Sequence, residues 1–361
     1  MSFPLHLVLV STFLSPLVDT LSAPLVDEAF NSFMEKYEKK YSSDDELKLR
    51  RGVFTQTLFD IARINEEGGS FNFTADVNEF ADMSSEEFTD RMLCGPSASN
   101  NAFNVEEELV LSSDTPVEQL PESVDWETAG AMAPTRDQGK CGCCYAIQAA
   151  TMAESRFKLK TGMDRVVPLS VQQLVDCSSI DTGNKGCKGG RVENCGFYIH
   201  TSGLVKEKVY PYVAKDGECK QDVVDLPVNQ CIKKGDIEGW FAIPPMDELA
   251  MRTAVAGGPI SVRIHASTSR FRNYRFGIIT SSECSEGNMN HAISIVGYGK
   301  SPEGVEYWKI LNSWGPTWGE NGYGYIQRND PKNPAGPCGI MREPDLYPSF
   351  RDGLTPGTCL E

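Results

Sequence analysis

The chain has 361 residues, of which 40% are hydrophobic and 23% charged, so it can bury a sizeable core and is not disordered. Its formal net charge of −16 argues against a nucleic-acid binder or an anionic-membrane binder. Its twelve cysteines are too many for an ordinary cytosolic enzyme and indicate an oxidising compartment.

The first 22 residues have the pattern of a secretory signal peptide. Residues 3–18 are mostly apolar, and small residues follow at Thr20, Ser22 and Ala23. We expect a signal peptide at residues 1–22, cleaved near Ser22 or Ala23. The alternative is a buried N-terminal element. No later apolar run reaches the roughly 20 residues of a membrane-spanning helix, so we expect no membrane anchor.

Residues 24–119 form an acidic block, with 8 Lys and Arg against 21 Asp and Glu, a net charge of −13. A Ser-, Asn- and Glu-rich stretch at 97–118 predicts an exposed linker before the nearly neutral remainder. Apolar residues at helical spacing predict helices in the acidic block: Phe30, Phe33, Met34, Tyr37, Leu47, Val53, Phe54, Leu58, Ile61 and Ile64. Cys94 is the only cysteine before residue 120.

The remainder of the chain reads as half helical and half β. Residues 144–160 have helical spacing. Short apolar runs at 259–264, 291–298, 307–312 and 322–327 predict strands of an antiparallel sheet or barrel. The fold class we predict is therefore α+β.

The strongest chemical signal is the segment 138–146, Gln-Gly-Lys-Cys-Gly-Cys-Cys-Tyr-Ala. A thiol in the first turn of a helix has a lowered pKa, because the positive end of the helix dipole stabilises the thiolate. Such a nucleophile needs a histidine that can hold a proton, and His200, His265 and His291 are the only histidines after residue 120. We take His200 and His265 as structural.

His291 begins a predicted strand, and Asn312 ends another within Asn-Ser-Trp-Gly. Taken alone, each has an ordinary explanation: His291 as a core histidine, Asn312 as a turn residue and Cys144 as a structural cysteine. Their combined sequence contexts favour a catalytic set, in which Asn312 holds the imidazole of His291.

These segments closely resemble the papain-like cysteine peptidases of the cathepsin L-like branch. The matching motifs are Gln138 six residues before Cys144, Gly297-Tyr298-Gly299 after the histidine, and 312–315 with Trp318-Gly319 beyond. Glu46, Arg50, Phe54, Ile61 and Asn65 fit the family's interrupted propeptide motif, residues 78–82 fit its second motif, and residues 120–126 look like the start of a mature enzyme. The departures are Thr57, Asp76, Cys143 and Tyr145, where Asn, Gly, Ser and Trp are usual.

The resemblance implies a two-lobe papain-like fold preceded by a helical inhibitory propeptide at 23–119. The mature peptidase would span 120–361, with a mainly helical lobe to about residue 235, a mainly β lobe at 236–350 and a tail at 351–361. It implies that Cys144 is the nucleophile and His291 the base that later acts as acid. Gln138 and the Cys144 N–H would form the oxyanion hole.

The resemblance also implies substrate-binding residues. Trp314 would shield the His–Asn contact, and Gly189 and Gly190 would pair with the substrate backbone. The wall of the second subsite would comprise Arg191, Val192, Arg263, Met289, Ala292 and Glu343. We hypothesise that the two arginines neutralise Glu343, so that the pocket does not select basic side chains.

Three disulfides are implied by the same resemblance: Cys141–Cys187, Cys177–Cys219 and Cys284–Cys338. The pairing of Cys143, Cys195, Cys231 and Cys359 stays open. A zinc site is the alternative use of cysteine, but no ligand spacing supports one, and we expect no metal and no cofactor.

The resulting hypothesis is a monomeric cysteine endopeptidase that acts through a thioester acyl-enzyme and is made as an acid-activated zymogen. Its partners would be protein or peptide substrates and its own propeptide, with no nucleic acid. It would be secreted or lysosomal/vacuolar. The absence of a histidine pair argues against an exopeptidase with an occluding loop. The alternatives are a catalytically silent binding or inhibitory relative and a transglutaminase-like acyl transferase; Asn312 in place of Asp and the propeptide argue against the latter.

We further expect the propeptide's carboxylates to make acid-sensitive contacts with the mature lobes.

Overall fold

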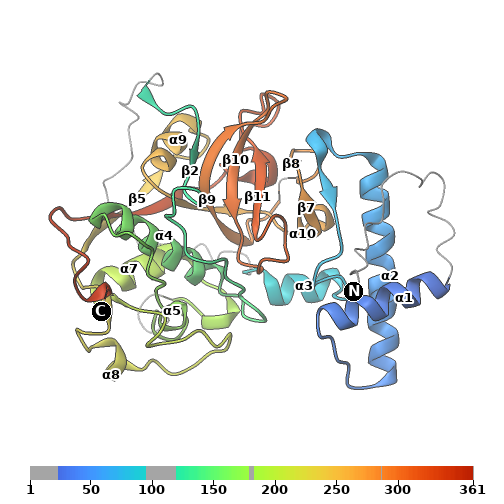
Figure 1. The fold of residues 1–361 in the computed structure, drawn as a ribbon, viewed down its shortest axis with the longest axis horizontal. Helices are drawn as coiled ribbons and strands as arrows, with labels where there is room; N and C mark the ends of the chain where they lie inside the picture. The colour runs from blue at the N-terminus through green and yellow to red at the C-terminus, as the bar shows by residue number, and fades with distance from the viewer. Residues whose placement is uncertain (1–22, 95–118, 179–182, 286, 361) are drawn as a thin grey trace, which may run out of the picture.

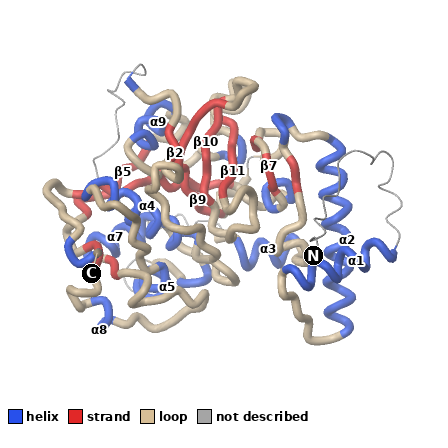
Figure 2. Tube along the Cα trace, viewed as in Figure 1, coloured by secondary structure: helices blue, strands red, loops and turns tan. Residues whose placement is uncertain are grey.

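The computed structural model describes residues 23–94, 119–178, 183–285 and 287–360. The predicted signal peptide and the whole of the predicted linker lie outside these residues. The described chain forms an N-terminal helical region, residues 23–94, and two further lobes, one rich in helices and one built on a sheet (Figures 1 and 2). The predicted α+β two-lobe fold with a preceding helical region is confirmed.

The N-terminal region is built on two helices, α1 (Ala23–Lys36) and α2 (Asp44–Glu67). Ser43 caps α2 by accepting a hydrogen bond from the Glu46 N–H. Phe30 and Phe33 of α1 pack on Phe54 of α2 with ring centres 5.3 and 4.8 Å apart. The periodic apolar residues therefore make the contact between the helices, as amphipathic helices require.

The same region then crosses to the sheet lobe and turns back toward the boundary between the lobes (Figure 1). Strand β1 (Thr74–Ala75) pairs with β7 (Tyr274–Phe276), and Asn65 holds β1 by accepting from the Ala75 N–H and donating to its carbonyl, at 2.8 and 2.9 Å. Helix α3 (Ser85–Met92) opens with a capping box between Ser84 and Glu87. Buried residues from Ile61 to Leu93 join the core of the sheet lobe in one cluster.

The helical lobe contains four described helices and one short strand pair. They are α4 (Cys144–Thr161), α5 (Val171–Cys177), α7 (Val192–Ser202), α8 (Gln221–Val224), β3 (Leu204–Val205) and β4 (Gln230–Ile232). Every residue of α4 from Cys144 to Ser155 is buried, because the helix lies between the lobes and packs on both. The polar side chains of that stretch, such as Gln148 and Glu154, are buried with it and therefore need hydrogen-bond partners inside the protein.

The sheet lobe is a mostly antiparallel eight-stranded sheet in the order β5-β12-β6-β9-β10-β11-β8, with β2 also paired to β9. Its elements are β2 (Val124–Asp125), β5 (Ile237–Ile243), α9 (Glu248–Ala256), β6 (Ile260–Ile264), α10 (Ser269–Arg272), β8 (Ile278–Ile279), β9 (His291–Lys300), β10 (Glu306–Leu311), β11 (Tyr323–Gln327) and β12 (Asp345–Phe350). The four predicted strands are β6, β9, β10 and β11.

Each lobe includes a segment from the other half of the chain. Strand β2, in the first half, pairs with β9 of the sheet lobe. The C-terminal tail returns to the helical lobe, where Cys359 is bonded to Cys231. Arg156 of α4 ties the lobes further by donating to the Pro259, Ala254 and Gly258 carbonyls at 2.8–2.9 Å.

Candidate active site

The three predicted catalytic side chains come from three element ends that the fold brings to the boundary between the lobes. Cys144 is the first residue of α4, and His291 is the first residue of β9. Asn312 directly follows β10, which runs antiparallel to β9 in a register that pairs Leu311 with Ser294. This register places Asn312 beside His291. The two side chains meet at 2.8 Å, between Asn312 Oδ1 and His291 Nε2.

The hydrogen bonds of Asn312 fix the tautomer of His291. Asn312 Oδ1 also accepts from the Ser313 backbone N–H at 2.8 Å, so this atom is the amide oxygen. His291 Nε2 must then carry the hydrogen and donate it, which leaves the lone pair of a neutral imidazole on Nδ1. Among the described residues, Nδ1 has no hydrogen-bond partner although it is buried. The arrangement leaves Nδ1 available as a base.

His291 is fully buried in this form of the protein, and burial lowers its pKa to about 4, although the bond to Asn312 opposes the shift. The Trp314 ring stacks on the imidazole with centroids 4.6 Å apart. The predicted shield therefore lies directly against His291. In this state the imidazole is neutral at physiological pH.

Gln138 is oriented by a serine that sequence reasoning did not single out. Ser313 Oγ donates to Gln138 Oε1 at 2.8 Å, so Nε2 must point the other way. Gln138 Nε2 donates to the Met92 carbonyl at 3.0 Å and to the Cys141 carbonyl at 3.1 Å. The amide that we predicted to hold an oxyanion thus holds a backbone carbonyl of the N-terminal region.

Cys144 is not a free thiol in the structure, which corrects the sequence-based picture of an unmodified nucleophile. Its sulfur is bonded to that of Cys94, two residues after α3, with Cα atoms 6.8 Å apart. Cys94 had no assigned role. The odd cysteine in an otherwise cysteine-free acidic block was the signal that could have found it.

The neighbouring Cys143 has a different environment from Cys144. Its thiol is buried and lies 2.9 Å from the Tyr212 hydroxyl, which donates to the Gln138 carbonyl at 2.7 Å. Burial raises the pKa of the Cys143 thiol to about 12. A thiol held protonated in this way is a poor nucleophile at neutral pH.

The predicted glycine segment needs its glycines for a reason we did not anticipate. Gly189 has a φ of +101°, which side chains with a Cβ rarely adopt. At Gly190 a Cβ would come within 2.5 Å of Asn184 Oδ1 and 2.8 Å of the Tyr145 ring. Packing within the protein alone is therefore enough to exclude a side chain at Gly190.

The charges of the predicted second subsite form two ion pairs, and those of the second pair also act on Arg263. Arg263 Nε lies 3.6 Å from Glu343 Oε2, while Arg191 Nη2 lies 2.7 Å from Glu193 Oε1. Arg191 is therefore engaged by its own helix-start neighbour. Val192, Met289 and Ala292, the apolar members of the predicted wall, are buried. Burial lowers the pKa of Arg263, an effect that Glu343 opposes.

The disulfides of the structure use ten of the twelve cysteines. Three bonds join the pairs implied by the resemblance: Cys141–Cys187, Cys177–Cys219 and Cys284–Cys338. Two more join Cys231 to Cys359 and Cys94 to Cys144. Cys143 and Cys195 are buried free thiols. Within the described ranges, no group of three or more His, Cys, Asp or Glu residues could hold a metal ion.

A second contact that sequence reasoning missed links the helix to the sheet. Gln148, one turn after Cys144 on α4, accepts a hydrogen bond from Ser294, three residues after His291 on β9. Both residues are buried. The contact ties the element that carries Cys144 to the element that carries His291.

The N-terminal region buries the site from the sheet side. Phe80 and Phe88 pack edge-on against Trp314, with ring centroids 5.8 and 5.1 Å away. Because Trp314 stacks on His291, these rings reach the catalytic neighbourhood through a single intervening residue. An edge-to-face pair adds about 0.5–1.5 kcal/mol beyond its area burial.

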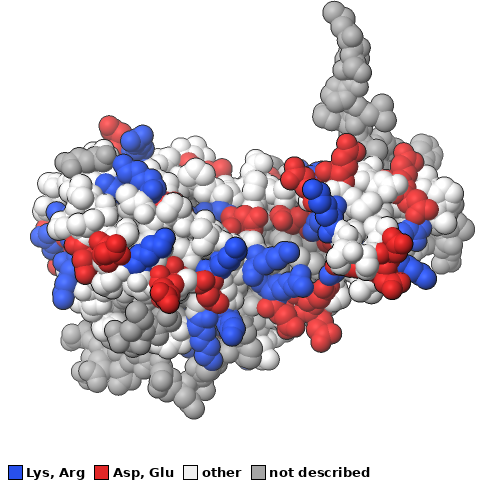
Figure 3. Space-filling view, turned by 90° about the horizontal axis from the view of Figure 1, so that it is seen from below, with Lys and Arg blue, Asp and Glu red and all other residues white. Residues whose placement is uncertain are grey.

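Carboxylates of this region pair both within it and, as expected, with the mature lobes, where Glu67 forms an ion pair with Arg270. Arg50 binds both oxygens of Glu87 at 2.6 and 2.8 Å, and this contact lowers the pKa of Glu87. Glu79 does face Thr317 across the junction at 2.9 Å, but burial raises its pKa. On the face seen in Figure 3, acidic and basic side chains lie next to each other.

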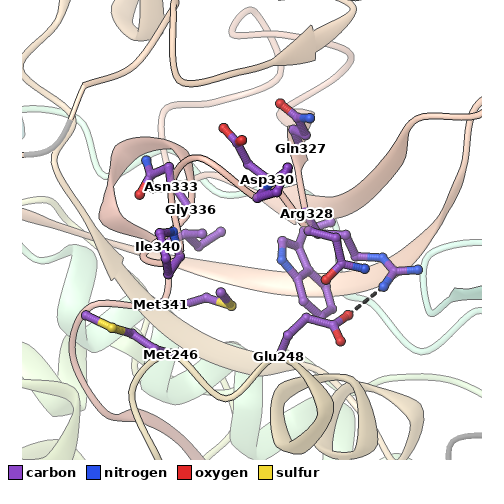
Figure 4. Close-up of a pocket in the computed structure, with 13 residues that line it drawn as sticks. Met246, Glu248, Gln327, Arg328, Asp330, Asn333, Gly336, Ile340 and Met341 are labelled. Carbon is purple, nitrogen blue, oxygen red and sulfur yellow. Dashed lines mark hydrogen bonds and ion pairs between the residues drawn. The ribbon is translucent and has the colours of Figure 1, made fainter.

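A hollow of about 330 Å³ lies elsewhere on the sheet lobe, between α9, β11 and the loop that follows β11 (Figure 4). Glu248 and Arg328, which form an ion pair, line it (Figure 4), and so does Trp308. None of the predicted site residues lines it. This hollow is therefore separate from the candidate active site.

The fold and the site define a thiol-dependent peptidase in a proenzyme form. Residues 120–347 match the papain family cysteine protease, and residues 30–88 match the cathepsin propeptide inhibitor domain. The chain therefore belongs to the papain family and is a cysteine-type endopeptidase that carries its own propeptide inhibitor domain. The predicted resemblance to the cathepsin L-like branch is confirmed.

Relatives of similar length support this assignment. The chain is 36% identical over 324 residues to a senescence-specific cysteine protease of Oryza sativa, covering 88% of each chain. It is 34% identical over 342 residues to cathepsin L of Sarcophaga peregrina, covering 93% of this chain and 95% of that one. A recombinant stem bromelain precursor superimposes with a TM-score of 0.78 and 31% identity, covering 91% and 99% of the two chains. Among the described residues, no helix has the length and apolar character needed to cross a membrane.

Proposed function

We propose that the protein hydrolyses internal peptide bonds through a thiolate–imidazolium pair of Cys144 and His291. The observation that carries the proposal is the contact of the Gln138 amide with the Met92 carbonyl at 3.0 Å, two residues from the cysteine that covers Cys144. A peptide carbonyl thus lies where the oxyanion hole would hold the scissile carbonyl of a substrate.

The chemistry follows from the positions of these groups once Cys144 is free. The proton of the Cys144 thiol moves to His291 Nδ1, and the helix dipole of α4 stabilises the thiolate. The thiolate attacks the substrate carbonyl, and the Gln138 amide and the Cys144 N–H stabilise the developing oxyanion. His291 then returns its proton to the leaving amine, and water hydrolyses the thioester. Asn312 holds the imidazole in the required orientation throughout.

The proposal extends to the zymogen and its activation by acid. The predicted signal peptide at 1–22 would direct the chain into the secretory pathway, to the outside of the cell or to a lysosome or vacuole. Glu87 has a pKa lowered by Arg50, so its contribution to the stability of the propeptide is present above its unfolded pKa and is lost as pH falls through the lowered value. Acid would therefore loosen the fold of the propeptide itself. Cleavage at 112–120 would release the mature chain.

A direct test uses the processed, thiol-reduced protein and a peptide blocked at both ends, so that only internal cleavage gives a signal. We expect Cys144→Ser to abolish turnover and Cys143→Ser to keep most of it. A processed wild-type protein that cleaves no peptide under these conditions contradicts the proposed activity. Turnover by Cys144→Ser contradicts the assignment of the nucleophile.

A further inference from the structure

We propose that the proenzyme is covalently locked by the Cys94–Cys144 disulfide, so that activation requires reduction by a small thiol in addition to cleavage of the chain. The inference rests on the proposed role of Cys144 as nucleophile. It makes Cys94 a protecting group on that nucleophile, supplied by the protein itself.

Several contacts place Cys94 at Cys144. Helix α3 ends at Met92, whose carbonyl is held by Gln138 at 3.0 Å. The next two residues, Leu93 and Cys94, are both buried. The Cys94 sulfur also lies 3.5 Å from the Gly142 carbonyl, just before the start of α4. These contacts place Cys94 beside the start of α4.

The cysteine inventory makes this bond the one disulfide between the two segments of the zymogen, in addition to the polypeptide chain itself. All twelve cysteines lie in the described residues, and four of the five disulfides join residues after 120. Only Cys94–Cys144 connects the N-terminal region with the peptidase. Cleavage at 112–120 alone would leave the propeptide attached through this bond. The nucleophile would stay blocked even after proteolysis.

Release of the lock is a thiol–disulfide exchange that balances with two small thiols. The first thiolate attacks the Cys94 sulfur, and the Cys144 thiolate leaves. The Cys144 thiolate is the better leaving group because the α4 N-terminus stabilises it. A second thiol then reduces the mixed disulfide on Cys94, which gives a free Cys94 thiol and the oxidised dimer of the small thiol. Of the two protons supplied, one stays on Cys94 and the other moves to His291 Nδ1.

Burial of both sulfurs determines the order of the two activation steps, loosening of the propeptide and reduction of the disulfide. The exposed fractions of Cys94 and Cys144 are 3% and 0%, so a small thiol has little access while the propeptide is docked. Loosening of the propeptide, by acid or by cleavage, would therefore precede reduction. We expect a cleaved but unreduced form that is inactive and still carries its propeptide.

The test begins with thiol counting on the full proenzyme, produced under oxidising conditions and denatured without reductant. The lock predicts two alkylated thiols, Cys143 and Cys195, and a mapped peptide that joins Cys94 to Cys144. The Cys94→Ser variant should have three alkylated thiols, with Cys144 added. The matched control Leu93→Ala loses an adjacent apolar side chain but keeps the disulfide, so it should again show two.

The second readout is retention of the propeptide after the linker is cut, followed by non-reducing gel electrophoresis in denaturant. Wild type and Leu93→Ala should keep the propeptide until a thiol such as glutathione or cysteine is added, whereas Cys94→Ser should lose it without thiol. Labelling of Cys144 in the undenatured wild-type proenzyme without reductant, or four free thiols with no Cys94–Cys144 peptide, overturns the lock. A mapped lock in a protein without peptidase activity leaves the lock standing and overturns the proposed function instead.

Discussion

Ser313 should control catalysis through Gln138 alone, and this can be measured as a coupling between the two residues. Ser313→Ala removes the hydroxyl that donates to Gln138 Oε1 at 2.8 Å and keeps both backbone contacts of residue 313, to Gln138 N and Asn312 Oδ1. A neutral hydrogen bond contributes about 0.5–1.5 kcal/mol. If this acts on the transition state, kcat falls by up to about tenfold.

The matching variant Gln138→Ala removes the oxyanion donor itself and should lower kcat by about 10²–10³-fold. Because Ser313 acts by orienting Gln138, adding Ser313→Ala to Gln138→Ala should cause no further loss. The assay is steady-state kcat and KM of the reduced, processed variants on one peptide substrate. If the fold-losses in kcat of the two single variants multiply in the double variant, Ser313 does not act by positioning Gln138.

Three further predictions follow from the ion pairs and thiols of the site. Arg50→Met should lower the free energy of urea unfolding of the proenzyme by about 1 kcal/mol at neutral pH. It should also make this free energy fall less steeply below about pH 4.3, because Glu87 then lacks the partner that lowers its pKa. An unchanged pH dependence contradicts this. Arg263→Met should raise the preference for Arg over Leu in the second subsite about tenfold in a positional-scanning library, because Glu343 loses its partner at 3.6 Å; no change would mean that Glu343 is not neutralised by Arg263. Cys143→Ser should leave the pH profile of kcat/KM unchanged, because the pKa of about 12 keeps that thiol protonated throughout.

Much of the site was predictable because its residues sit at element ends with strong local patterns. Cys144 directly follows a glycine-containing turn and begins a helix, and His291 and Asn312 flank two apolar strands. The local sequence is enough to predict where such helices and strands begin and end. The antiparallel pairing of β9 with β10 then brings His291 and Asn312 together without any further long-range information.

Contacts between segments distant in the sequence were not predictable in the same way. The disulfide between Cys94 and Cys144 joins cysteines that are 50 positions apart in the sequence. The hydrogen bond between Ser294 and Gln148 spans 146 positions. Neither residue pair has a pattern in the sequence that names its partner. The packing of Gly190 against Asn184 was likewise not predictable, because it joins residues that only the folded structure brings together.

The carboxylates of the propeptide are a further case in which the sequence alone did not predict the contacts. A net charge of −13 at 24–119 predicts acid sensitivity but not its location. The structure lowers the pKa of two carboxylates within the propeptide, Glu87 through Arg50 and Glu46 through Ser42. It gives Glu79 at the junction a raised pKa, which favours docking as pH falls. Counting charges could not separate these opposing contributions.

The central claim is that Cys144 is the nucleophile of a cysteine endopeptidase. The most direct measurement is titration of the reduced, processed protein with an epoxide inhibitor of thiol peptidases, followed by peptide mapping. We expect peptidase activity to fall in proportion to inhibitor added and to reach zero at one label per chain, with the label on Cys144. A label on Cys143, or activity that persists after Cys144 is fully labelled, would contradict the account.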